Sequence, residues 1–312
     1  MDTIFDYDVT LYDRRFLNCC QRHAIVWLKR IGAPVNLLFY NALASSDTIM
    51  RQMVIEKKPK YAIECDFYSP ADLQLIGVTP HETTADRFNQ IKDLIQSRIA
   101  RDGFVLLAGN VFYFPHCPEY RNSHALHVVV LRGHDACGRW DVVDDNHASV
   151  LCEYSYEEEF VRDYFENNTD RRLRYFDFDS AAPPQRATDA IAARFHDYIR
   201  GYVDSYWFYD NVEQIAANPL DTQAMKIRAL HDAFTILSGS RLSFAKYLEV
   251  GGWPASICAT ARAISQAAFI LKSMMVKAQI SQKLKIADLR TRCANLKELE
   301  SNMLSDLRAA VA

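Results

Sequence analysis

Residues 127–145 of the chain read HVVVLRGHDACGRWDVVDD. Two runs rich in valine stand on either side of a short polar segment, a pattern typical of two β-strands joined by a turn. Apolar residues fall on both faces of the first run, so we expect this strand to be buried on both sides. The rest of residues 1–180 mixes further strand patterns with helical ones, and the whole segment predicts an α+β domain.

The character of the sequence changes near residue 180. The segment DSAAPPQ, residues 179–185, holds two adjacent prolines among small residues and is typical of a linker. Four stretches after it keep apolar residues at helical spacing: residues 190–206, 222–250, 254–280 and 287–310. We therefore predict two domains, residues 1–180 and residues 181–312, the second an all-helical bundle or cap.

The last helical stretch carries a regular apolar stripe. Its members are Leu289, Cys293, Leu296, Met303 and Leu307. Such a stripe is more often part of a core than of an interface between two chains, and this one is too short to predict a coiled coil. Core packing is therefore the favoured interpretation, and the seam of a homodimer is the alternative.

The composition excludes several classes of protein. The chain has 312 residues, 49% of them hydrophobic, and a formal net charge of −3. It has no long basic run of the kind that binds nucleic acid or an anionic membrane surface, so we expect neither partner. No run of 18 apolar residues occurs, and the first residues, MDTIFDYDVTLYDRR, lack the apolar core of a signal peptide. We therefore expect a cytoplasmic protein whose eight cysteines are reduced.

Cys20 is the candidate nucleophile. Residues 20–30, CQRHAIVWLKR, lack glycine and proline and are followed by Gly32, so they predict a helix that begins at or beside Cys20. The N-terminus of a helix stabilises a thiolate, and its N–H groups can hold an oxyanion. Cys19 is adjacent and points in a different direction, so residue type leaves the choice open, and position relative to the helix favours Cys20. The structural alternative is that both are small buried apolar residues.

A histidine and an acid follow in the strands already described. His127 opens the first strand and Asp144 ends the second, with Asp145 as the alternative acid. Cysteine, histidine and aspartate are the parts of a catalytic triad in which a thiol attacks, an imidazole moves the proton and a carboxylate orients the imidazole. Acyl transfer or hydrolysis is therefore the leading prediction.

These local sequences resemble those of the butirosin biosynthesis protein H family, papain-like cysteine proteins that transfer acyl groups in natural-product assembly. The resemblance rests on C-x-x-x-A at Cys20, on GNVFYFPHCPEY at residues 109–120, and on the strands with His127 and Asp144. Family members also have a helical C-terminal region. The resemblance implies a papain-like first domain.

Two positions depart from the family pattern. Cys19 stands where the family is expected to have histidine, and Asn110 stands where it commonly has an aspartate that could contact substrate. The chain also lacks the glutamine that papain-like peptidases place shortly before the cysteine to bind the oxyanion. Asn18 is the candidate donor in its place.

The resemblance also implies a reaction. Cys20 would attack an acyl or aminoacyl thioester on the phosphopantetheine arm of an acyl or peptidyl carrier protein, giving an acyl-enzyme. A small-molecule amine would then accept the acyl group, with His127 as acid and base and Asp144 as the orienting group. We expect no tightly bound cofactor, because the carrier brings the phosphopantetheine arm.

Other functions are compatible with the same residues. With water as acceptor the site would be that of a thioesterase or peptidase, with an internal nucleophile that of a cyclase, and a non-catalytic scaffold could keep the fold. Zinc is a further alternative, since eight histidines and cysteines lie between residues 116 and 152. They include neither a C-x-x-C pair nor an H-E-x-x-H helix, so we expect no metal site.

Overall fold

The computed structural model describes residues 3–181 and 184–311 and has a mixed α+β fold. The chain forms two compact units. Unit 1 consists of Met1–Arg14, Asn18–Ala33 and Gly77–Ala182, and unit 2 of Arg15–Leu17, Pro34–Ile76 and Pro183–Ala312. The sequence analysis assigned all of residues 1–180 to the first domain, whereas residues 34–76 group with the helical unit. The predicted linker, residues 179–185, includes residues 182–183, which lie outside the described residues.

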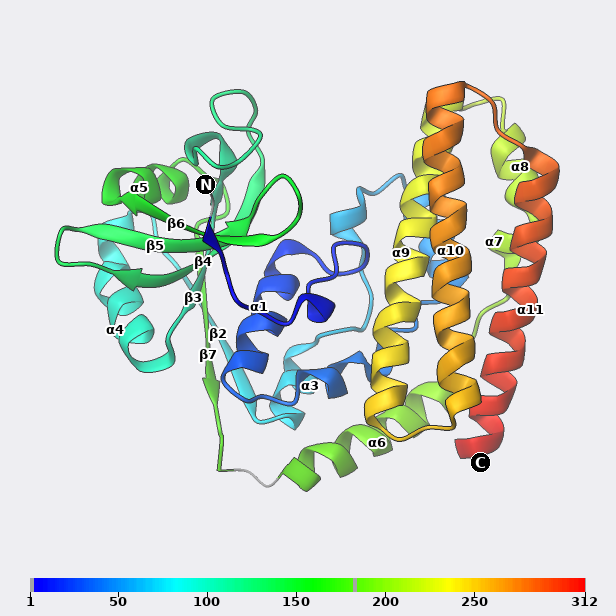
Figure 1. Ribbon diagram of the computed structural model, residues 1–312, viewed down its shortest axis with the longest axis horizontal. Coiled ribbons are helices and arrows are strands. Elements are labelled where there is room, and N and C mark those ends of the chain that lie inside the picture. Colours follow the sequence, from blue (N-terminus) through cyan, green and yellow to red (C-terminus); the bar gives the residue numbers. More distant parts are fainter. Residues whose placement is uncertain (1–2, 182–183, 312) are drawn as a thin grey trace. The chain divides into compact units, whose positions relative to one another are not determined.

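Unit 1 is built on an antiparallel sheet, seven-stranded within the described residues, with the order β1-β6-β5-β4-β3-β7-β2 (Figure 1). The strands are β1 (Thr3–Ile4), β2 (Val78–Thr84), β3 (Val105–Asn110), β4 (Leu126–His134), β5 (Arg139–Asp145), β6 (Leu151–Glu157) and β7 (Arg172–Phe178). The two strands predicted from residues 127–145 are β4 and β5, which pair directly. The α+β prediction is therefore confirmed.

The helices of unit 1 pack on this sheet. They are α1 (Cys19–Arg30), α4 (Lys92–Asp102) and α5 (Glu158–Glu166), with short turns η1 (Val9–Leu11), η5 (Phe88–Gln90) and η6 (Val111–Tyr113). In β4, Val128 to Leu131 are all buried, because alternate residues pack on opposite faces of the sheet. Val129 and Leu131 pack with α4 and α5, and α1 packs against β3 and β4. The prediction that this strand is buried on both faces is confirmed.

Unit 2 is helical. Its long helices α9 (Gln223–Val250), α10 (Ala255–Ser281) and α11 (Ile286–Val311) run beside one another (Figure 1). The remaining elements are η2 (Val35–Asn41), α2 (Ser46–Met50), η3 (Arg51–Ile55), η4 (Lys60–Ala62), α3 (Pro70–Leu75), α6 (Pro184–Gly201), α7 (Trp207–Asp210) and α8 (Val212–Ala217). The predicted helical C-terminal region is confirmed.

Residues 34–76 belong to unit 2 because of their apolar side chains. Leu37, Leu38 and Phe39 of η2 are buried, and η2 packs on α9. Helix α9 is buried along most of its length, since α10 packs against it as well. Burial of this apolar surface favours one helical core that includes residues 34–76.

The apolar stripe of α11 lies in that core. All five of its members are buried within the chain: Leu289, Cys293, Leu296, Met303 and Leu307. The stripe is therefore core packing, as favoured. Across the described residues, no helix combines the length and the apolar composition that crossing a membrane requires.

Candidate functional site

The site begins at the first turn of α1, which starts at Cys19, beside Cys20 as predicted. Asn18 is the N-cap residue: its Oδ1 accepts a hydrogen bond from the Gln21 N–H (3.0 Å), and Gln21 Oε1 accepts from the Asn18 N–H (3.1 Å). This reciprocal pair is a capping box, which fixes the residue at which the helix begins. Both thiols therefore lie in the first turn, near the positive end of the helix dipole.

The Cys19 thiol lies beside the His127 imidazole, close enough for the two side chains to interact. Burial alone would disfavour the Cys19 thiolate, but the interaction with the His127 side chain and its positive charge, with a smaller contribution from Arg22, lower the pKa of Cys19 below its usual value. A low pKa and contact with a base are the properties of an activated thiol. Cys19 therefore has the environment that the sequence analysis assigned to Cys20.

Cys20 points elsewhere. Its Sγ accepts a hydrogen bond from Arg174 Nη1 (2.9 Å), and Arg174 Nε donates to Glu82 (2.6 Å). Burial outweighs the attraction of Arg174 and raises the pKa of Cys20. The structure thus brings Cys19, rather than the expected Cys20, to His127, because successive residues of a helix project about 100° apart.

His127 and Asp144 are in contact, as predicted. His127 Nε2 lies 2.8 Å from Asp144 Oδ1 and 3.0 Å from Oδ2, which leaves Nδ1 as the ring nitrogen for Cys19. The alternative acid, Asp145, has its carboxylate 3.9 Å from His127 and pairs with Arg14 at 3.0 Å. Asp144 is therefore the carboxylate that orients the imidazole.

The charges of His127 and Asp144 stabilise each other. Burial opposes both charged forms, yet Asp144 and the Cys19 thiol hold the pKa of His127 well above its usual value. In the same way His127, together with hydrogen bonds from neighbouring histidines, holds the pKa of the buried Asp144 well below its usual value. An imidazolium between a thiolate and a carboxylate is the arrangement that a thiol nucleophile needs.

Two histidines whose contact with Asp144 was not predicted from the sequence lie at this carboxylate. His116 Nε2 lies 2.9 Å from Asp144 Oδ2, and the fully buried His23 has its Nε2 3.3 Å from Oδ1. Burial lowers the pKa of His23, which favours its neutral form. A signal existed for His23, because it follows Cys19 by four residues and lies one helical turn further along the same face.

The two predicted asparagines take part in local structure. Asn110 is buried; its Nδ2 donates to the Asn167 carbonyl (2.9 Å) and contacts His124 Nδ1 (3.0 Å), and its Oδ1 accepts from the Phe112 N–H (3.2 Å). These bonds occupy the Nδ2 group and one of the two acceptor positions of Oδ1, so they hold the Asn110 amide in local structure. Asn18 keeps only its Nδ2 group for an oxyanion, since its Oδ1 caps α1.

Two groups around Asp144 have the residue types of a metal site. Asp144 is grouped with His23 and His127, and also with His116 and Cys117. Burial, with the charge of Asp144, raises the pKa of Cys117 far above its usual value, which favours the protonated thiol while no metal is bound. The geometry of Asp144 is that of hydrogen bonds to imidazoles.

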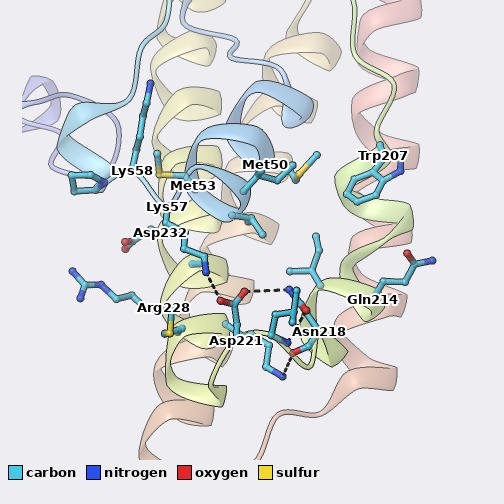
Figure 2. Close-up of a pocket in the computed structure, with 18 residues that line it drawn as sticks. Met50, Met53, Lys57, Lys58, Trp207, Gln214, Asn218, Asp221, Arg228 and Asp232 are labelled. Carbon is cyan, nitrogen blue, oxygen red and sulfur yellow. Dashed lines mark hydrogen bonds and ion pairs between the residues drawn. The ribbon is translucent and has the colours of Figure 1, made fainter.

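A cavity of about 250 Å³ reaches the site and is lined in part by His127, Asp144 and Asp145. Unit 2 has a larger cavity, about 700 Å³, between η3 and the start of α9 (Figure 2). Trp207 lies on one side of it, and an ion pair between Lys57 and Asp221 lies on another. None of the predicted catalytic residues lines this larger cavity, whereas His127 and Asp144 line the smaller one.

No protein-family model matches the chain. The chain is 26% identical over 248 residues to a curated protein of Niallia circulans, and the match covers 77% of this chain and 78% of that protein. That protein is named ribostamycin:4-(gamma-L-glutamylamino)-(S)-2-hydroxybutanoyl-(BtrI acyl-carrier protein) 4-(gamma-L-glutamylamino)-(S)-2-hydroxybutanoate transferase. With its Cys-His-Asp site and its similarity to this transferase, the chain resembles the butirosin biosynthesis protein H family, as its sequence motifs predicted.

Proposed function

We propose that the chain is a cysteine-dependent acyltransferase of natural-product biosynthesis, with a papain-like unit 1. It would move an acyl or aminoacyl group from a carrier-protein thioester to an amine acceptor. The observation that carries the proposal is the juxtaposition of Cys19, in the first turn of α1, with His127, whose Nε2 lies 2.8 Å from Asp144. The similarity to a transferase whose name includes an acyl-carrier protein supports the choice of donor.

In the proposed reaction, Cys19 carries out the first half. His127 holds the proton of the thiol, and the Cys19 thiolate attacks the thioester carbonyl carbon. The N–H groups of the first turn of α1 face the developing oxyanion, where they have the right charge to stabilise it. When the tetrahedral intermediate collapses, the C–S bond to the phosphopantetheine arm breaks, and His127 gives its proton to the leaving thiolate.

The second half regenerates the thiol. The neutral amine of the acceptor attacks the acyl-Cys19 carbonyl, and His127, now neutral, takes the proton that the amine loses. The C–S bond to Cys19 breaks, and an amide forms. Asp144 accepts the Nε2–H of His127 throughout, so that Nδ1 stays directed at the thiol.

The test is intact-protein mass spectrometry after incubation with a panel of acyl thioesters, carrier-bound ones included. We expect an added acyl mass on the wild type and on Cys20→Ala, and none on Cys19→Ala. An adduct that disappears only in Cys20→Ala would return the nucleophile to the position predicted from sequence.

An added amine acceptor completes this test. Aminolysis is supported if the acyl mass leaves the protein and appears as an amide of the acceptor. Release to water alone would make the protein a thioesterase, and the absence of any adduct across the panel would favour a non-catalytic scaffold.

A further inference from the structure

Asp144 is almost completely buried, with 1% of its surface exposed, and a buried carboxylate needs several donors to stay ionised. The His127 imidazole supplies one, and the Asp145 N–H supplies another to Oδ1 at 2.8 Å. A triad needs no more imidazole than that, yet His116 directs another at Oδ2, and the fully buried His23 has its Nε2 3.3 Å from Oδ1. His116 is the one that needs an explanation, because both of its ring nitrogens have hydrogen-bond partners.

The proton on His116 can be placed from its two partners. Nδ1 lies 2.8 Å from the Tyr156 hydroxyl, and Nε2 lies 2.9 Å from the Asp144 carboxylate. An ionised carboxylate only accepts hydrogen bonds, so Nε2 carries the proton and, in neutral His116, Nδ1 accepts from the Tyr156 O–H. Asp144 therefore sets the tautomer of His116, and the Tyr156 hydroxyl holds the other ring nitrogen in place.

The ring of His116 is also held in position. Its side chain is 4% exposed, and the ring stacks on Tyr154 with centroids 4.1 Å apart and planes 17° apart. Phe114 packs near it as well, at 5.4 Å. A ring fixed by packing and by two hydrogen bonds has a single orientation toward Asp144.

We propose that His116, with its ring held by Tyr156, is a positioning residue that keeps Asp144 ionised and directed at His127. The inference rests on the proposed function, in which His127 alternates between charged and neutral forms. When His127 is neutral, at the acyl-enzyme stage, Asp144 loses the cation beside it but keeps the His116 N–H. The carboxylate then still accepts from His127 Nε2, and Nδ1 remains the base for the incoming amine.

The test follows the rate of Cys19 alkylation by iodoacetamide against pH, which needs no acyl donor. His116→Phe removes the donor and keeps a ring of similar shape, and Tyr156→Phe removes only the hydroxyl. We expect His116→Phe to move the midpoint of alkylation upward by about one pH unit, because an Asp144 carboxylate that is no longer held toward His127 stabilises the thiolate–imidazolium pair less. Tyr156→Phe should give a smaller shift in the same direction.

Rescue separates positioning from packing. Glutamine can place an N–H group close to where His116 Nε2 stands, so His116→Gln should restore most of the wild-type midpoint. His134→Phe is the matched control, because His134 also contacts an aromatic ring of unit 1 (Trp140, 4.6 Å), and its hydrogen-bond partner among the described residues is Gln96 (3.2 Å) rather than a member of the triad. It should leave the midpoint unchanged.

The result that overturns the inference is a wild-type midpoint in folded His116→Phe and in Tyr156→Phe, or a His116→Gln variant as impaired as His116→Phe. If His116→Phe does not fold, Tyr156→Phe decides. The shifts can be present while no acyl thioester gives an adduct, in which case the proposed function fails and the positioning role stands.

Discussion

Replacing Gly109 by alanine tests how tightly the site is packed. Gly109 lies on β3 opposite His127 on β4. A Cβ at this position would lie 2.2 Å from ring atoms of Tyr164, far inside van der Waals contact. The Tyr164 ring has no space to move into, because it is fully buried and stacks on Phe114 with centroids 4.1 Å apart. Tyr164 also donates a hydrogen bond to the His127 carbonyl at 2.8 Å, so displacing its ring disturbs the catalytic strand.

The expected cost has two parts. Overpacking of a rigid core costs about 3 kcal/mol at the upper end of its usual range. Loss of the Tyr164–His127 hydrogen bond adds about 1 kcal/mol. We therefore expect Gly109→Ala to lower the free energy of unfolding of unit 1 by about 4 kcal/mol in all, and to slow alkylation of Cys19.

Urea unfolding followed by tryptophan fluorescence measures this cost. In a background with Trp207→Phe and Trp253→Phe, the remaining tryptophans, Trp27 and Trp140, both lie in unit 1. Gly201→Ala is the control, because a Cβ there meets nothing within 4 Å, and it should be neutral or slightly stabilising. A Gly109→Ala protein as stable as the wild type would refute the packing argument.

Three further results are expected. The pKa of Cys19 is lowered and its thiolate is the reactive form, so Cys19 should alkylate at a lower pH than an ordinary thiol. His127→Ala should move the pH midpoint of Cys19 alkylation upward. An unchanged midpoint would count against an ion pair between Cys19 and His127. In unit 2, Arg241 and Glu300 form a buried ion pair, so Arg241→Met should destabilise that unit by about 3–5 kcal/mol in urea unfolding, because it leaves a buried carboxylate unpaired; a cost near zero would contradict this. Dialysis against EDTA should leave the alkylation rate of Cys19 unchanged, and a loss that added Zn²⁺ restores would revive the metal-site alternative.

Local sequence was sufficient to predict most strands and long helices and to predict two residues of the site, His127 and Asp144. The valine runs of residues 127–145 specify a strand pair by their composition, and helical spacing after residue 184 specifies long amphipathic helices. His127 and Asp144 could be predicted because they stand on paired strands of one hairpin. Their separation is therefore set by the local register.

The tertiary structure decided what depends on direction and on distant partners. Which of Cys19 and Cys20 meets His127 depends on how α1 is rotated against β4, and the sequence of a helix start does not contain that angle. His116 reaches Asp144 only because the loop after β3 folds over β5 and β6, where Tyr156 and Tyr154 receive its ring. Residues 34–76 belong to unit 2 because their apolar side chains are buried against α9. Their place in the chain, between two segments of unit 1, does not indicate this. Short-range patterns therefore specify elements, whereas packing of elements distant in sequence selects the thiol and surrounds the carboxylate.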